Sequence, residues 1–246
     1  YFMSKYKVIS FYKYVEVENP EGFAKEHLNW CLKNGILGKV YLAKEGISGS
    51  VFGNDEAISK YKNQLKSFKK FEDIWFKEIP TDQIAFKKMH VRVKDEIVNS
   101  GLHATKLEIT APKLTPEQLL KFYEDGKDFV IVDARNWYES KIGKFKNAIT
   151  PQITHFREWP KVVEELEEFK DKTIVTYCTG GIRCEKASAY MREKGFKDVY
   201  QIDGGILNFI QQWPDTYWEG GLFVFDDRKV IEPNTKEELK YTANCH

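Results

Sequence analysis

The segment Tyr177–Cys184 places a cysteine, two glycines and an arginine within eight residues, as Tyr-Cys-Thr-Gly-Gly-Ile-Arg-Cys. It follows an apolar run that predicts a buried strand, and it leads into a predicted helix that begins at Ile182. At such a junction the glycines let backbone N–H groups turn inward, while the helix N-terminus and Arg183 add positive potential. We therefore expect Cys178 to be an activated thiolate in an anion-binding loop. The loop residues between Cys178 and Arg183 are Thr179, Gly180, Gly181 and Ile182.

Three further side chains are candidates for supporting this loop. Asp133 and Arg135 lie at the end of a predicted buried strand, and they either pair to hold the loop or contact a substrate directly. Cys184 lies one residue after Arg183. It either resolves an oxidised Cys178 or packs beneath the loop.

The 246-residue length suggests two domains, and the 42% hydrophobic content is sufficient for packed cores. Four cysteines in a chain of this size do not form a disulfide framework. No apolar run approaches the roughly 20 residues that span a bilayer, and we see no export signal. We expect a cytoplasmic protein with no membrane association, no protein partner that the sequence reveals and no cofactor.

The histidines and cysteines show no metal-binding spacing. Near the C-terminus, Cys245 and His246 supply one ligand each, and two ligands cannot complete a tetrahedral site. We therefore predict no metal.

The first half of the chain shows the β-α-β-β-α-β order of a ferredoxin-like fold. The expected strands and helices are 6–17, 20–34, 39–43, 47–52, 54–67 and 74–79, with 86–98 extending the sheet. This ferredoxin-like N-terminal domain is predicted over residues 4–98.

In the second half, apolar strands alternate with helices, a pattern that indicates a parallel α/β sheet with helices on its faces. The expected strands are 129–133, 173–177 and 198–201. One helix is expected to begin at Thr115, and three more are expected over 160–169, 182–194 and 206–212. We expect a linker over residues 99–112, a second domain over 113–220 and a C-terminal extension over 221–246.

Charge is distributed unevenly between the two halves. Through Lys94 the chain has 17 Lys and Arg against 11 Asp and Glu, and the remainder has 21 against 26. The basic half predicts either a docking surface for a polyanion or a solvated lysine surface. If the polyanion is RNA, the candidate contacts with aromatic neighbours include Lys44, Lys88, His90 and Arg92. Glu185 and Lys186, after the loop, either meet RNA or face solvent.

Several motifs resemble the rhodanese family. The active loop of that family runs Cys-x-x-Gly-x-Arg, and its flanking signatures resemble two further segments here. The matching residues are Cys178, Gly181 and Arg183, then Val132–Arg135 with Glu139 and Gly143, then Ile202–Ile206. The resemblance implies a rhodanese-like domain. Related dual-specificity phosphatases place one more residue between cysteine and arginine, so the loop size disfavours a phosphatase.

The longer run Tyr177–Ser188 is more particular, and it resembles the bacterial tRNA uridine(34) hydroxylase family. Other matching segments are Ala43–Ile47, His90–Lys94, Phe156-Arg157 and Phe223–Asp226. The resemblance implies tRNA as partner and molecular oxygen as co-substrate. It also implies 5-hydroxyuridine as the product at the wobble uridine, with the loop cysteine required. Family members end in a cysteine-rich tail, so we expect a trimmed or missing tail after His246.

Two alternatives remain open from the residues alone. The same loop could carry a persulfide on Cys178, as in a sulfurtransferase. The chain could also be a non-catalytic RNA-binding module that retains the loop.

Overall fold

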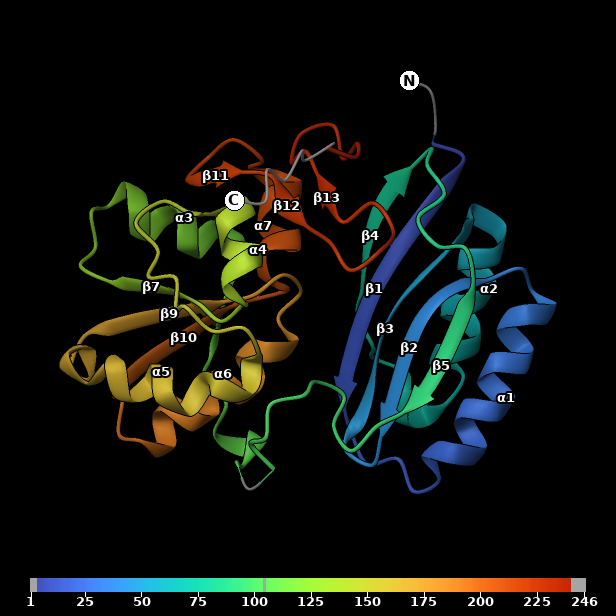
Figure 1. Ribbon diagram of the computed structural model, residues 1–246, viewed down its shortest axis with the longest axis horizontal. Helices are drawn as coiled ribbons and strands as arrows, with labels where there is room; N and C mark the ends of the chain where they lie inside the picture. The colour runs from blue at the N-terminus through green and yellow to red at the C-terminus, as the bar shows by residue number, and fades with distance from the viewer. Residues whose placement is uncertain (1–3, 104, 240–246) are drawn as a thin grey trace. The chain divides into compact units, whose positions relative to one another are not determined.

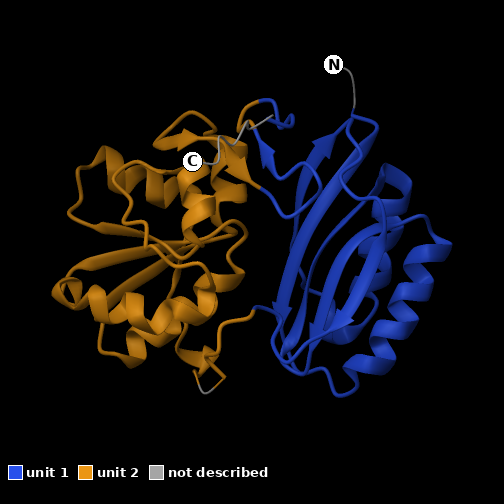
Figure 2. Ribbon diagram, viewed as in Figure 1, with its two compact units in different colours: residues 1–98, 224–231, 235–246 blue, residues 99–223, 232–234 orange. Residues whose placement is uncertain are grey.

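The computed structural model describes residues 4–103 and 105–239 and divides into two compact units (Figure 2). Unit 1 holds the described residues of 1–98, 224–231 and 235–246, and unit 2 holds those of 99–223 and 232–234. The segment expected to be a linker, 99–112, therefore belongs to unit 2. The expected extension 221–246 is divided between the units, and its end, with Cys245 and His246, lies outside the described residues.

Unit 1 is built on one five-stranded sheet in the order β4-β1-β3-β2-β5. Its elements are β1 (Tyr6–Tyr14), α1 (Pro20–Lys33), β2 (Leu37–Ala43), β3 (Gly46–Asn54), α2 (Asp55–Lys66), the 3-10 turn η1 (Lys69–Phe71), β4 (Phe76–Thr81) and β5 (Met89–Val93). The first four strands pair antiparallel, whereas β5 runs parallel to β2 at the edge. This order confirms the predicted ferredoxin-like fold with its additional strand.

Both helices of unit 1 begin where the sequence supplies a cap. Asn19 accepts a hydrogen bond from Gly22 N ahead of Pro20, and Asn54 accepts one from Ala57 N. The helices lie together on one side of the sheet (Figure 1). Between them and the sheet is a buried core that includes Phe11, Leu42 and Tyr61. The strand side chains that face the helices are therefore apolar, and the alternate side chains of each strand form the opposite face of the sheet.

Unit 2 contains a parallel sheet in the order β6-β10-β9-β7. Its elements are β6 (Lys113–Leu114), α3 (Pro116–Glu124), β7 (Val130–Asp133), α4 (Trp137–Ile142), β8 (Gly143–Phe145), α5 (Trp159–Glu165), β9 (Thr173–Tyr177), α6 (Ile182–Glu193), β10 (Asp198–Ile202), α7 (Gly205–Gln212), β11 (Trp218–Gly220) and β12 (Leu222–Phe223), with 3-10 turns η2 (Leu107–Ile109), η3 (Phe156–Glu158) and η4 (Glu167–Phe169). Helices cover both faces: α5 and α6 lie below the sheet in Figure 1, and α3, α4 and α7 lie above it. This arrangement confirms the predicted parallel α/β architecture.

The structure differs from the predicted elements in several places, and the short strands β6, β8, β11 and β12 are among the elements that were not predicted. The short helix α4 was not predicted, because six residues are too few to show a helical period. The helix predicted over 160–169 ends at Glu165 and continues as a 3-10 turn. The strand β13 (Val230–Ile231) lies in the expected extension, in unit 1. Within the described residues, no helix is both long and apolar enough to cross a membrane.

Candidate active site

The predicted loop lies between the end of β9 at Tyr177 and the start of α6 at Ile182. Its turn depends on Gly181, whose φ of 97° is in the left-handed region that favours glycine. Two loop carbonyls accept hydrogen bonds from the first turn of α7: Ile206 N donates to Cys178 O and Leu207 N donates to Thr179 O, both at 3.0 Å. With these carbonyls engaged by the start of α7, the loop N–H groups remain available on its inner side.

Close packing of the loop against α7 requires glycine at position 205. Gly205 has a φ of 66°, and a Cβ there would lie 2.3 Å from Cys178 O. The closing signature Ile202–Ile206 therefore has a definite role. It brings backbone N–H groups against the loop at a distance that a side chain would prevent.

The Cys178 thiol is stabilised as a thiolate. Gly181 N donates to its Sγ at 3.1 Å. Burial alone would raise the pKa of Cys178, but the hydrogen bond from the Cys184 thiol, the charge of Arg183 and the N–H groups of Arg183 and Cys184 lower it to about 5. A pKa in this range favours the anionic form of the sulfur at neutral pH.

Cys184 lies on the first turn of α6 and is fully buried. Burial and the hydrogen bond to the Cys178 sulfur raise its pKa well above the ordinary thiol value. It therefore keeps its proton and donates it toward the Cys178 thiolate. Of the two roles considered for Cys184, the position beneath the loop is observed; a resolving role remains a prediction.

Arg183 is held by Glu139 of α4 through two hydrogen bonds, of 2.6 and 2.9 Å. Both side chains are buried, at 6% and 0% exposure. Glu139 also accepts a hydrogen bond from Asn136 N at the start of α4. Glu139 was noted only as a signature residue and not as part of the site. In the sequence, only the spacing of Glu139 from Asp133 within that signature indicated that Glu139 could belong to the site.

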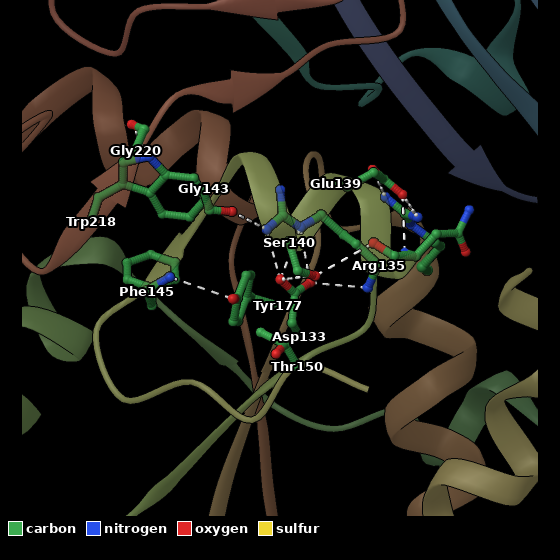
Figure 3. A network of polar contacts seen from close by, with 12 residues as sticks. Asp133, Arg135, Glu139, Ser140, Gly143, Phe145, Thr150, Tyr177, Trp218 and Gly220 are labelled. Carbon is green, nitrogen blue, oxygen red and sulfur yellow. Dashed lines mark hydrogen bonds and ion pairs between the residues drawn. The ribbon is translucent and has the colours of Figure 1, made fainter. Parts of the chain in front are cut away.

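Asp133 and Arg135 form a buried ion pair at the end of β7, with Nη2 and Oδ2 2.6 Å apart (Figure 3). Ser140 Oγ donates to the same carboxylate, and Arg135 donates to Gly143 O. The Arg135 guanidinium also lies 5.6 Å from the centre of the Tyr177 ring, at the end of β9. These contacts connect β7, α4 and β9, and they thereby support the loop that follows β9. They favour the holding role over direct substrate contact.

The remaining loop residues differ in their surroundings. Thr179 is 5% exposed, and its hydroxyl has no hydrogen-bond partner among the residues that the structure describes. Gly180 and Ile182 are half-buried, and a Cβ at Gly180 would meet nothing within 4 Å. Cys178 itself is 0% exposed. A substrate therefore reaches the sulfur only after the groups covering it move.

The other predicted residues are exposed residues of unit 1 or buried residues of unit 2. Lys44, Lys88, His90 and Arg92 are exposed residues of unit 1. The expectation that Glu185 and Lys186 meet RNA or face solvent is wrong, because both are buried, at 7% and 2% exposure. Glu185 instead accepts hydrogen bonds from Thr110 and Gln201, and it pairs with Lys113.

No group of three or more His, Cys, Asp or Glu is placed to hold a metal ion in residues 4–103 and 105–239. Cys31 is fully buried in the core of unit 1, and burial raises its pKa to about 12.

Comparison with known proteins gives a match over both units. A family model described as the UPF0176 acylphosphatase like domain matches residues 6–97, and the rhodanese-like domain model matches residues 115–212. A tRNA uridine(34) hydroxylase of Acholeplasma laidlawii is 43% identical over 95% of this chain and 75% of its own length. Proteins of the same name from Enterococcus faecalis and Listeria welshimeri are 43% and 44% identical, each over 94% of this chain and 74% of their own length.

Proposed function

This chain belongs to the tRNA uridine(34) hydroxylase family, and from that premise we propose that it hydroxylates carbon 5 of uridine 34 in tRNA at the Cys178 loop. The observation that carries the proposal is the Cys178 thiolate, with its pKa lowered to about 5 at a strand-to-helix junction. The family match covers the sheet of unit 1 as well as the loop of unit 2. The enzyme is thus an oxidoreductase of tRNA modification, and a tRNA substrate implies action in the cytoplasm.

A thiolate suits this chemistry because uracil is an electrophile at carbon 6. Addition of the Cys178 sulfur to carbon 6 moves an electron pair toward carbon 5 and the carbonyl oxygen at position 4. Loop N–H groups and the Arg183 charge stabilise the anions that form. The Thr179 hydroxyl, which has no partner among the described residues, is a further donor for that carbonyl oxygen.

Carbon 5, made electron-rich in this way, then reacts with molecular oxygen to give a hydroperoxide. Two electrons and two protons from an external reductant cleave the O–O bond, so that one oxygen atom stays on carbon 5 and the other leaves as water. Loss of the proton from carbon 5 expels the Cys178 thiolate and restores the double bond. We propose molecular oxygen as the co-substrate, with no other cofactor.

A sulfurtransferase would use the same thiolate to carry a persulfide. The loop size and the low pKa of Cys178 are compatible with that activity. However, the relatives of Acholeplasma laidlawii, Enterococcus faecalis and Listeria welshimeri, which match nearly the whole chain, are each named as hydroxylases. The hydroxylase activity is therefore favoured.

The test is mass spectrometry of tRNA from a deletion strain complemented with variants of this chain. Wild type and Cys31→Ser should both restore 5-hydroxyuridine, because Cys31 lies in the core of unit 1. Cys178→Ser should restore none. With the purified enzyme under ¹⁸O₂, the new hydroxyl should carry ¹⁸O. Restoration by Cys178→Ser, or label derived from water, would refute the proposal.

The addition step has its own test. An anticodon-loop RNA with 5-fluorouridine at position 34 should form a protein–RNA species that survives denaturation, because fluorine blocks the final loss of the carbon 5 proton. The species should be absent with Cys178→Ser. An active enzyme that forms no such species would count against addition at carbon 6.

A further inference from the structure

Strand β5 is the edge strand of unit 1, and its side chains are divided sharply between two faces. Met89, Val91 and Val93 pack into the core beneath the helices. Both ends of the strand are fastened to β2, since Gly38 N donates to Lys88 O at 3.0 Å and Lys94 N donates to Leu42 O at 2.8 Å. Within β5 the alternate side chains, those of His90 and Arg92, therefore turn to the opposite face, and Lys88 and Lys94 adjoin the two ends of the strand.

The opposite face of this edge is entirely cationic or imidazole in character. His90 and Arg92 project there, Lys88 and Lys94 adjoin them at the two ends of the strand, and all four are exposed. None of the four has an ion-pair partner within the described part of the chain. Successive members are two residues apart along the strand, or about 6.5–7 Å. We call this row the basic ridge.

An aromatic side chain lies next to the basic ridge on the same face of the sheet. The register pairs Lys39 of β2 with His90, and Tyr41 of β2 with Arg92. Lys39 and Tyr41 are both half-buried. The ring of Tyr41 is thus one strand away from the cation of Arg92.

We propose that the basic ridge binds successive phosphates of a single-stranded segment of the substrate tRNA, and that Tyr41 stacks on one of its bases. The spacing of the cations is similar to that of phosphates along an extended strand. An aromatic ring beside a cationic track is the arrangement by which single-stranded nucleic acids are bound. An acidic protein partner would account for the cations of the basic ridge but not for the position of Tyr41 beside them. The inference rests on the proposed function for the identity of the RNA, and it adds where that RNA binds.

The experiment compares two triple variants with equal loss of charge. The ridge variant is Lys88→Ala, Arg92→Ala and Lys94→Ala. The control variant is Lys25→Ala, Lys33→Ala and Lys69→Ala, at exposed positions on α1 and η1. Binding of unmodified tRNA is measured by fluorescence anisotropy over a series of salt concentrations.

The ridge variant should bind at least about tenfold more weakly at 0.15 M salt. The magnitude of the slope of log K against log salt should fall by about 2, since each lost contact to a single strand accounts for about 0.7. The control variant should keep the wild-type slope. Tyr41→Ala should weaken binding between about fivefold and a hundredfold with an unchanged slope, because stacking is worth about 1–3 kcal/mol per base. Equal effects of the two triple variants would overturn the proposal.

Two further measurements separate this proposal from the proposed function. Cys178→Ser should bind tRNA with the wild-type slope while producing no hydroxyuridine. In the ridge variant the KM for tRNA should rise while kcat at saturating tRNA stays close to wild type. If the enzyme makes no hydroxyuridine but the ridge variant still loses the slope, the hydroxylase proposal fails and the basic ridge stands.

Competition tests the single-stranded form of the RNA. Poly(U) should displace tRNA from the wild-type protein far better than double-stranded RNA of the same length. Equal competition by the duplex, or by poly-glutamate, would overturn the single-strand assignment. Unchanged thermal unfolding of both triple variants confirms that they are folded.

Discussion

Replacing Cys184 with alanine should raise the pKa of Cys178, because the substitution removes the thiol that donates to the Cys178 sulfur. This hydrogen bond is the foremost of the effects that lower the pKa of Cys178 against its burial. The charge of Arg183 and the loop N–H groups remain in the variant. The change therefore isolates one contribution without removing the anion-binding loop.

The size of the effect follows from the strength of a hydrogen bond to a charged group. Such a bond contributes about 1.5–3 kcal/mol, and 1.36 kcal/mol corresponds to one pKa unit. The pKa of Cys178 should therefore rise from about 5 to between about 6 and 7. At pH 6 the thiolate fraction should fall from about nine-tenths to between about a tenth and a half.

The assay is the thiolate absorbance at 240 nm as a function of pH, with the Cys178→Ser protein as the subtracted blank. The folded-state pKa of Cys178 lies below the ordinary thiol value, so the thiolate of the wild type persists as the pH falls and is lost only near pH 5. Hydroxylation should decline over the same range. Cys184→Ser is the matched control: its hydroxyl keeps a donor, so the midpoint should move by less than about one pH unit.

Two results would refute this reasoning. A wild-type midpoint near the ordinary thiol value would show that burial outweighs the donors around Cys178. An unchanged midpoint in Cys184→Ala would show that the Cys184 thiol does not stabilise the thiolate. In that second case Arg183 and the loop N–H groups would be sufficient.

Other contacts around the loop have measurable consequences for stability and reactivity. Glu139→Gln should lower the free energy of unfolding by about 3–5 kcal/mol in urea titrations, because it leaves the buried charge of Arg183 unmatched; a loss below about 1 kcal/mol would contradict this. Gly205→Ala should abolish hydroxylation while leaving a folded protein by circular dichroism, since its Cβ would displace Cys178 O; full activity would show that α7 does not hold the loop. At pH 7.5, native Cys31 should stay unmodified by iodoacetamide, because burial raises its pKa to about 12, and peptide mapping should find it alkylated only after unfolding.

Much of the fold could be predicted because local patterns in the amino-acid sequence specify its strands and helices. The apolar strands and the order of elements were sufficient to predict the sheet of unit 1 and strands β7, β9 and β10 of the parallel sheet. Among the elements that were missed, α4 has six residues, and its buried Glu139 pairs with Arg183 of the distant helix α6. Glu185 and Lys186 show the same limit. Charged residues read from the sequence as surface residues, whereas here they are buried among polar groups of distant segments.

The amino-acid sequence by itself determined the nucleophile and its loop, since Cys178, the two glycines and Arg183 are consecutive or nearly so, and a loop of this length has few ways to turn. Tertiary structure alone decided the charge state of that nucleophile and the position of the basic ridge beside Tyr41. The pKa of Cys178 depends on how fully it is buried and on which donors point at it. The basic ridge exists because β5 pairs in parallel with β2 at the sheet edge, which turns alternate side chains to the face away from the helices. Electrostatic energies depend on distances in space, and sequence separation does not specify those distances.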